Sequence, residues 1–261
     1  MNIKILVVAH KHYWMPEDSV YLPLHVGAEG KPDLGYTKDN TGDNISAKNP
    51  NFCELTGLYW AWKNLEADYV GLVHYRRYFT RKEVRNIDKK KAQILGKEEW
   101  ENILSVHPVV VADKRKYYIE TNRSHYNHAH PSIGLDETER IIQEKYPEYS
   151  AAFTTVMNRT WAHMFNMFVM RRDLFDAYCQ WMFAILFELE KRLDISSFDA
   201  YNSRVFGFVC ERLLDVWLEK NQIAYKEKNV SFMESQNWIK KGGLFLKRKV
   251  FGKWRLVLYE E

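Results

Sequence analysis

Short apolar runs alternate with longer amphipathic or polar stretches along the first part of the chain. Compact runs rich in β-branched residues predict four strands, over 3–9, 21–26, 69–73 and 108–112. Apolar residues at helical spacing predict a helix from 51 to about 65 and a shorter one over 98–106. The order strand, strand, helix, strand, helix, strand is typical of an α/β fold with a mostly parallel sheet.

The second half of the chain is predicted to be more helical. The pattern predicts helices over 136–145, 148–158, 173–193 and 203–221, and strands over 164–170 and 223–230. No internal repeat interrupts this pattern, so we expect one domain over 1–230. The remaining residues, 231–261, interleave aromatic and leucine side chains with lysine and arginine. Such a basic-aromatic tail forms either a solvated edge or a patch that binds anionic lipid.

A polar segment without periodicity separates the second predicted strand from the first predicted helix. Residues 29–51 are rich in Gly, Asp, Asn and Lys, and a loop of this length inside a compact domain is usually a binding loop or disordered. Within it, Asp43, Asn44 and Ser46 have short polar side chains that are able to bond to sugar hydroxyls or a nucleobase edge. The same residue types favour ordinary turns, so both interpretations stay open.

One predicted strand ends abruptly in polar residues. The apolar run 69–73 is followed without a spacer by His74, Tyr75, Arg76 and Arg77. In open α/β sheets, ligands bind beyond the carboxyl ends of the strands. Two arginines and a histidine at such a place favour an anionic ligand, most simply a phosphate or diphosphate, over a set of surface ion pairs.

Two carboxylates are candidates for chemistry. Glu54 lies near the start of the helix predicted from 51, where it either binds a ligand hydroxyl or favours the helix dipole. Glu211 lies in an otherwise apolar helix. It either pairs with a nearby arginine or serves as the base that deprotonates an acceptor hydroxyl.

Histidine and asparagine side chains indicate further polar sites in the second half of the chain. His125, His128 and His130 have a spacing that allows a metal site, and a metal hydrolase built on them is one hypothesis. No carboxylate or fourth ligand is near them in sequence, so hydrogen bonding to a polar substrate or acid–base work is the stronger interpretation. Asn166, within the apolar run 164–170, either joins a buried polar network or orients a sugar.

Composition adds limits to these interpretations. The 261 residues are 46% hydrophobic and 15% aromatic, which is ample for a packed core and fits a site that stacks on sugars or nucleobases. A net charge of +4, without a groove-reading basic helix, makes nucleic acid a weak hypothesis for a partner. Glycine-rich dinucleotide and phosphate loops and a serine nucleophile elbow are absent from the sequence.

The cysteines and the N-terminal sequence bear on the cellular compartment. Cys53, Cys179 and Cys210 lie in apolar, helical surroundings without pairing or zinc spacing, and we expect free thiols in a reducing compartment. The N-terminal apolar run is too short for a signal peptide, and no stretch reaches the roughly 20 apolar residues of a membrane helix. We therefore expect a cytoplasmic protein that contacts, at most, the inner face of the plasma membrane.

Six segments together resemble the bacterial family of glycosyltransferases for capsular and exopolysaccharide synthesis. They are 21–28, 42–46, 54–64, 71–79, 164–170 and 207–213, within a resemblance that covers about residues 3–230. The resemblance implies a GT-A-like fold that binds a nucleotide sugar, and a hexosyltransferase that uses it. Some members of the family are inverting galactofuranosyltransferases that use UDP-galactofuranose.

For an enzyme of this kind, we expect the following roles for the candidate residues. Donor binding is assigned to His10, Lys11, Val26, Gly27, Asp43, Asn44, Ser46, Glu54, Tyr59, Arg76 and Arg77. Acceptor binding is assigned to His128, His130 and Asn166, and catalysis to Glu211 and His74, with Glu211 as the base. The expected acceptor is a lipid-linked glycan or an oligosaccharide.

One departure from the usual GT-A pattern concerns metal. GT-A enzymes usually end a central strand in Asp-x-Asp, which holds a divalent cation on the diphosphate. Here the matching strand ends in His74-Tyr-Arg-Arg77, so cations replace carboxylates. We expect Arg76 and Arg77 to take over the electrostatic role of the metal, so that transfer needs no divalent cation. The competing hypothesis is a non-catalytic module that binds a nucleotide or an anionic glycan and needs no base.

Overall fold

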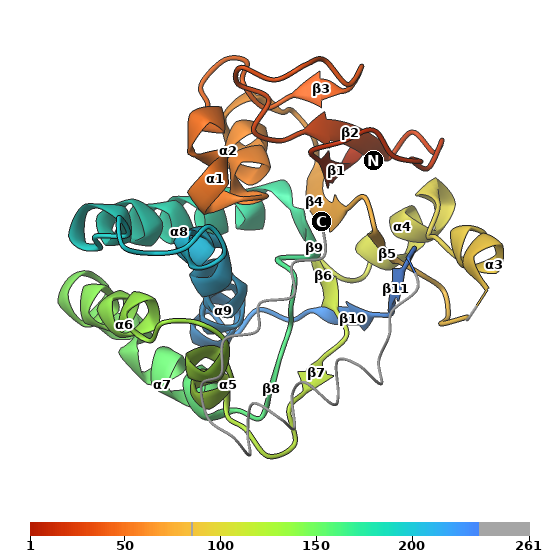
Figure 1. Ribbon diagram of the computed structural model, residues 1–261. Helices are drawn as coiled ribbons and strands as arrows, with labels where there is room; N and C mark the ends of the chain where they lie inside the picture. The colour runs from red at the N-terminus through yellow and green to blue at the C-terminus, as the bar shows by residue number, and fades with distance from the viewer. Residues whose placement is uncertain (85, 235–261) are drawn as a thin grey trace.

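A computed structural model describes residues 1–84 and 86–234 as a central sheet with helices on both faces (Figure 1). The strands are β1 Ile3–Ala9, β2 Tyr21–His25, β3 Thr37–Lys38, β4 Tyr69–His74, β5 Arg77–Phe79, β6 Val109–Ala112, β7 Arg115–Lys116, β8 Trp161–Ala162, β9 Phe168–Arg171, β10 Lys226–Lys228 and β11 Val230–Phe232. The helices are α1 Asn49–Phe52, α2 Leu55–Asn64, α3 Ile87–Lys91, α4 Lys97–Leu104, α5 Asn122–Ala129, α6 Ile133–Lys145, α7 Ser150–Asn158, α8 Arg172–Arg192 and α9 Val205–Lys220.

The main sheet has the strand order β10-β6-β9-β4-β1-β2-β3, with β5 attached to β4 and β11 attached to β5. The pairs β1–β2, β1–β4, β2–β3 and β6–β10 are parallel, whereas β9 runs antiparallel between β4 and β6. β7 and β8 form a separate small antiparallel ribbon. The α/β fold with a mostly parallel sheet that the sequence pattern predicts is therefore confirmed.

The apolar runs of the strands are nearly continuous because helices cover both faces of the sheet. Along β1, Leu6 faces the larger helical layer, whereas Ile5 and Val7 face the layer that contains α4. The side-chain period of two in a strand produces this alternation. Gly71 in β4 allows close packing, because a Cβ atom there would lie 2.7 Å from a methyl of Val169 on the neighbouring strand β9.

The first helix is broken where the sequence pattern predicts one continuous helix. α1 ends at Phe52 and α2 begins at Leu55, because Cys53 adopts a positive φ of 52° that is incompatible with a right-handed helix. Cys53 is therefore half-buried at a helix break, which corrects the expectation of a helical interior. Cys179 and Cys210 are buried in helices, and all three thiols are free.

Strand β9 begins later than the sequence pattern predicts. Phe165 and Asn166 form a turn ahead of the strand, with positive φ values of 76° and 53°. Asn166 therefore lies in this turn, which corrects its expected place inside a strand. Non-glycine residues at positive φ are uncommon and cluster at functional sites.

Helix α5 and strand β5 have no counterpart in the predicted elements. α5 is too polar to show an apolar stripe, and Thr121 caps it by accepting a hydrogen bond from the backbone N–H of Ser124. His125 and His128 thus lie on a helix and not on a loop.

The C-terminal part also departs from the expected elements. The predicted strand over 223–230 is replaced by β10 and β11, and β11 crosses the expected domain boundary at residue 230. Most of the expected basic-aromatic tail, 235–261, lies outside the described residues. None of the helices within 1–84 and 86–234 combines the length and apolar character that crossing a bilayer requires.

Candidate functional site

The polar candidates gather at one edge of the sheet, where β1 and β4 end side by side. These two strands are parallel and pair along almost their whole length. His10 follows β1, and Tyr75 and Arg76 form the turn that joins β4 to the antiparallel strand β5. The rings of His10 and Tyr75 make an edge contact with centroids 5.5 Å apart. Carboxyl ends of parallel strands are where α/β folds bind ligands.

This edge of the sheet is positively charged. Partial burial lowers the pKa of His10, and four nearby cations lower it further, namely Lys11, Arg76, Lys31 and Arg204. The cations come from four places in the chain, which are the end of β1, the β4–β5 turn, the loop after β2 and the residue before α9. Their convergence favours an anionic ligand such as a diphosphate.

Arg77 packs its guanidinium against two aromatic rings that contact each other. Its guanidinium carbon lies 4.5 Å from the ring centroid of Phe165 and 5.4 Å from that of Phe232. Burial lowers the pKa of Arg77, whereas the carboxylates of Glu211 and Glu54 raise it, so both carboxylates lie within electrostatic range. Its Nε is buried and has no hydrogen-bond partner among the residues that the structure describes. A buried charged donor left without a partner is costly, and this indicates a position that a ligand satisfies.

Arg76 is already paired at the surface. Its Nη1 lies 3.0 Å from a carboxylate oxygen of Glu234, and its backbone carbonyl accepts a hydrogen bond from the N–H of Met233 at 2.8 Å. Both charged side chains are about a third exposed. Exposed ion pairs of this kind contribute little free energy, so breaking the pair to free Arg76 would cost little.

Two hydrogen bonds link the turn before β9 to the last residue of β4 and to the residue that precedes α2. Asn166 donates through Nδ2 to Oε1 of Glu54 at 2.8 Å, and Glu54 is the residue that precedes α2. The Nε2 of His74 lies 2.7 Å from the carbonyl oxygen of Phe165. A carbonyl oxygen only accepts hydrogen bonds, so Nε2 carries the proton. His74 therefore holds the turn and, through it, the pair formed by Glu54 and Asn166.

The protonation state of His74 favours this positioning role over proton transfer. Burial lowers the pKa of His74 to about 3, and the neighbouring Arg77 contributes in the same direction. The imidazole is therefore neutral at pH 7, and its one proton is committed to Phe165. We place His74 as a positioning residue and keep Glu211 as the candidate base.

Replacing His74 with glutamine should flatten the dependence of stability on acid pH. The unfolded chain takes up a proton at His74 below pH 6.5, whereas the folded protein does so only near pH 3. Stability therefore falls as pH is lowered through this window, by about 1.4 kcal/mol per pH unit for one such group. Glutamine retains a donor for Phe165 but does not titrate. Urea unfolding at several pH values measures the slope.

The comparison isolates His74 because the other titrating groups stay in both proteins. The pKa of His125 is also lowered to about 3 by burial, so it gives an acid dependence of the same sign in the wild type and in the variant. The free energies of unfolding should differ most at the acid end of the window. Identical slopes for the two proteins would contradict a half-buried His74 that is neutral in the folded protein.

Glu211 is oriented by the residue that follows it. Its carboxylate accepts a hydrogen bond from Nη1 of Arg212 at 2.7 Å, and 17% of its side chain is exposed. Arg212 is buried, donates to the carbonyl oxygen of Phe208 at 3.1 Å and lies over the ring of Tyr126 at 5.3 Å. The pairing that the sequence left open is thus present, and it holds a partly enclosed carboxylate in a fixed direction, as a general base requires.

The three histidines around α5 have separate partners. His125 stacks on Tyr117, His128 pairs with the buried Glu120, and His130 stacks on Phe208. Among the described residues, no three His, Cys, Asp or Glu side chains are arranged to hold a metal ion. The donor set therefore does not support a metal hydrolase built on these histidines. His130 is the member that packs on α9, one turn before Glu211.

The polar loop after β3 is organised by a carboxylate that the sequence pattern does not single out. Asp39 is fully buried and accepts hydrogen bonds from the backbone N–H groups of Gly27 and Ala28 and from the hydroxyls of Ser46 and Thr56. These contacts fix the backbone that follows β2, where Gly27 has a positive φ of 61°. The structural role of Asp39 could not be predicted from the sequence, because the groups that donate hydrogen bonds to it come from separate segments of the chain.

Most of the expected donor-binding side chains near this loop support its shape. Val26 packs in the core, Ser46 is buried, and Asn44 accepts a hydrogen bond from the backbone N–H of Ser46 at 3.1 Å. Tyr59 donates to Asp43 at 3.1 Å near the surface. The side chains of Val26 and Ser46 are therefore not open to a ligand, whereas His10 and Lys11 are exposed.

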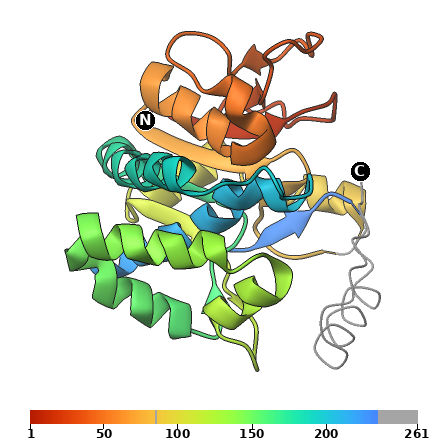
Figure 2. The same cartoon turned by 60° about the vertical axis from the view of Figure 1, so that its left-hand side comes forward.

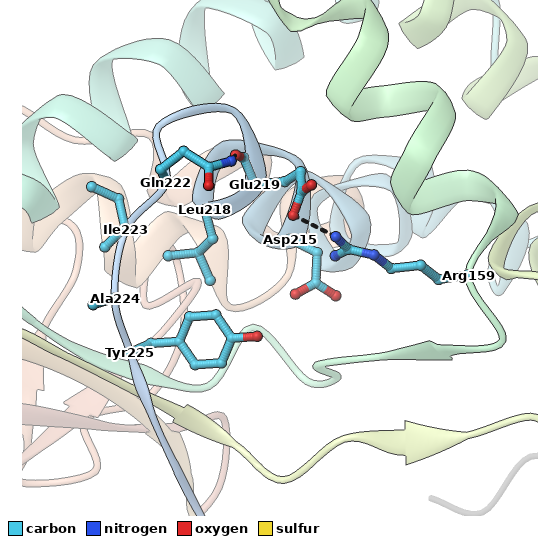
Figure 3. Close-up of a pocket in the computed structure, with 8 residues that line it drawn as sticks. All are labelled: Arg159, Asp215, Leu218, Glu219, Gln222, Ile223, Ala224 and Tyr225. Carbon is cyan, nitrogen blue, oxygen red and sulfur yellow. Dashed lines mark hydrogen bonds and ion pairs between the residues drawn. The ribbon is translucent and has the colours of Figure 1, made fainter.

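A separate small pocket lies at the end of α9 (Figure 3). Its volume is about 220 Å³, and it is lined by Arg159, Asp215, Leu218, Glu219, Gln222, Ile223, Ala224 and Tyr225. Arg159 pairs with Glu219, and Asp215 accepts hydrogen bonds from both the backbone N–H and the ring Nδ1 of the buried His163. Because these charged groups satisfy one another, we place the functional site at the ends of β1 and β4.

Comparisons with known proteins identify the fold. Residues 4–222 match the family described as a domain of unknown function, DUF4422. The solved apo structure of the bifunctional glycosyltransferase WbbM is similar with a TM-score of 0.83 and 31% sequence identity, over 90% of this chain and 46% of that chain. This chain thus spans about half the length of that protein. No curated protein matches. The expected GT-A-like fold and the expected resemblance to glycosyltransferases are confirmed.

Proposed function

We propose that this chain, which belongs to the DUF4422 family, is a glycosyltransferase that moves a sugar from a nucleoside-diphosphate donor to a glycan acceptor. The observation that carries the proposal is the convergence of cations at the carboxyl ends of β1 and β4, within electrostatic range of Glu211. The similarity to WbbM, a bifunctional glycosyltransferase, supports the reaction class. We propose capsular or exopolysaccharide synthesis as the process and UDP-galactofuranose as the first donor to test.

The donor diphosphate is bound by the cationic edge. Arg77 offers a guanidinium packed against two rings, with an Nε that has no partner among the described residues, and Arg76 becomes available when the diphosphate replaces Glu234. Exposed His10 and Lys11 border the same edge. These fixed positive charges stabilise the negative charge that develops on the leaving diphosphate as the glycosidic bond to the donor breaks.

The acceptor hydroxyl is activated by Glu211. As the acceptor oxygen attacks the anomeric carbon, its proton passes to the Glu211 carboxylate, the new carbon–oxygen bond forms, and the bond to the diphosphate oxygen breaks on the opposite face. The configuration at the anomeric carbon is therefore inverted. Glu54 is half-buried at the same centre and binds a hydroxyl of the donor sugar or the acceptor, and the buried Asn166 orients it through their hydrogen bond.

Independence from divalent metal is part of the proposal. The strand that ends in Asp-x-Asp in most GT-A enzymes ends here in a histidine, a tyrosine and two arginines. Guanidinium groups are permanently charged and form bidentate hydrogen bonds with phosphate oxygens. They can therefore neutralise the diphosphate, as the divalent cation does in metal-dependent GT-A enzymes.

The substrates of the proposed reaction indicate where in the cell the protein works. Nucleotide sugars and lipid-linked acceptors meet at the cytoplasmic face of a membrane, and we propose that the enzyme works there. The residues after Trp238 are rich in lysine, arginine and aromatic side chains, which favour anionic headgroups. This tail is one proposed point of contact with the membrane.

A transfer assay tests the proposed function. The full chain is incubated with a panel of nucleotide sugars, including UDP-galactofuranose, and with lipid-linked or free oligosaccharide acceptors. Released nucleotide is quantified and the product is identified by mass spectrometry. We expect nucleotide release that depends on the acceptor. Binding of a nucleotide sugar, detected as a rise in Tm, without turnover on any acceptor would overturn the proposal and favour a binding module.

A further inference from the structure

The turn between β7 and α5 exposes two large apolar side chains next to each other. Tyr118 is 81% exposed and Ile119 is 63% exposed. The other strongly exposed apolar side chain in the described part of the chain is Val106, at 71%, and it stands alone in sequence. Isolated exposed apolar residues are ordinary, but an adjacent pair at the tip of a turn indicates a surface that is covered in use.

This turn is held in place and is not a loose loop. Tyr117, at its base, is buried, stacks on His125 with ring centroids 4.0 Å apart and donates its hydroxyl to the sulfur of Met164. The backbone N–H of Ile119 donates to the carbonyl of Tyr117 at 2.7 Å, and Tyr118 has a positive φ of 59°. A strained and anchored turn that presents apolar side chains to water is consistent with a preorganised contact surface.

Positive charge flanks the apolar pair. Arg115 and Lys116, which form β7, are both exposed, and within residues 1–84 and 86–234 neither has an ion pair. In both views the turn that follows β7 forms the lower end of the molecule, far from β2 and β3 (Figures 1 and 2). Apolar side chains that project beyond unpaired cations match the headgroup layer of an anionic bilayer, which offers negative charge outside and hydrocarbon below.

We propose that Arg115, Lys116, Tyr118 and Ile119, the β7–α5 contact, bind the surface of an anionic phospholipid membrane. Tyr118 and Ile119 enter the headgroup region, and the two cations pair with lipid phosphates. The inference rests on the proposed function in one assumption: the acceptor glycan is anchored in the membrane. The base of the contact packs on α5, and α5 is followed by His130, which stacks on Phe208 one turn from Glu211. These contacts connect the β7–α5 contact to the helix that carries Glu211.

Vesicle co-sedimentation tests the contact with the full chain. The vesicles contain phosphatidylcholine alone or phosphatidylcholine with phosphatidylglycerol. We expect the wild type to bind the anionic vesicles, and the double variant Tyr118→Ser, Ile119→Ser to bind them about tenfold more weakly because two apolar side chains no longer leave water. Arg115→Ser with Lys116→Ser should reduce both the binding and its dependence on salt.

The matched control is Val106→Ser, which removes an equally exposed apolar side chain from another part of the surface and should leave binding unchanged. All three serine variants should keep the wild-type Tm, because the replaced side chains are mostly exposed. Vesicle binding by the double variant equal to that of the wild type would overturn the proposal and leave the C-terminal tail as the membrane contact. Absence of wild-type binding to anionic vesicles would also overturn it and favour a protein partner for this surface.

Transfer to a soluble acceptor separates this proposal from the proposed function. The double variant should transfer sugar to a soluble oligosaccharide at the wild-type rate and lose activity only on a vesicle-embedded acceptor. If the wild type binds vesicles through the turn but transfers no sugar to any acceptor, the proposed function fails and the β7–α5 contact stands.

Discussion

Replacing Glu211 with glutamine should lower kcat for sugar transfer by about 10²- to 10⁴-fold, with little change in KM for the donor. Glutamine has the shape of glutamate and keeps an oxygen that accepts the hydrogen bond from Arg212. It does not accept the proton of the acceptor hydroxyl. The loss should therefore appear in the chemical step, and the Tm should stay close to that of the wild type.

Glu219→Gln is the matched control for this variant. Glu219 lies on the same helix and also pairs with an arginine, Arg159, but it lines the pocket at the end of α9 (Figure 3). Its replacement should leave kcat near the wild-type value. Near-normal turnover of Glu211→Gln would show that another group is the base. A large loss in Glu54→Gln together with that result would move the role to Glu54, the other carboxylate close to Arg77.

Replacing Arg77 with methionine should lower kcat by about 10²- to 10³-fold, because it removes a fixed positive charge from the leaving diphosphate. Methionine keeps an unbranched apolar side chain against the rings of Phe165 and Phe232, so the packing of the β5 region should survive. The effect on kcat should exceed the effect on KM, since the charge acts most strongly on the transition state.

The control for Arg77 is Arg81→Met, which removes a cation that pairs with Glu99 at the surface, two residues beyond β5. Transfer by this variant should remain close to wild type. An Arg77→Met enzyme with raised KM and unchanged kcat would limit Arg77 to binding the donor. Unchanged values of both constants would remove it from the site.

The central strands and their polar ends were predictable from the sequence because their signal is local. The runs 3–9 and 69–73 are buried on both faces and stop where polar residues begin, so both the strand and the edge that forms the candidate site are visible in a few residues. Since parallel neighbours end at the same edge, residues after β1 and β4 could be expected to lie close together, and the rings of His10 and Tyr75 are in contact. The bond between Glu54 and Asn166 joins two residues that were singled out separately.

The parts of the site that could not be predicted depend on contacts between distant segments. Arg204 and Lys31 belong to the cationic edge only because the fold brings them there. The turn at 165–166 has positive φ values that its apolar sequence does not reveal, and His74 binds its backbone and not a side chain. Asp39 is likewise a structural centre whose donors come from separate segments.

The pairing of Arg76 with Glu234 connects the site to the end of the described chain. Glu234 follows β11, whose neighbour β5 carries Arg77, so the two arginines sit on a hairpin that β11 extends. A ligand that binds Arg76 would break its ion pair with Glu234. Glu234 lies two residues after the end of β11 and would then lose this contact. Donor binding is therefore expected to affect this segment more than the core strands.

Transfer in excess chelator tests most directly whether fixed positive charge replaces the metal of other GT-A enzymes. The full chain is dialysed against EDTA, and the rate of sugar transfer is then measured with EDTA present and after addition of manganese or magnesium. The account predicts the same rate in all three conditions, because Arg76 and Arg77 supply the charge on the diphosphate. Complete loss of transfer in EDTA, restored by manganese, would contradict it.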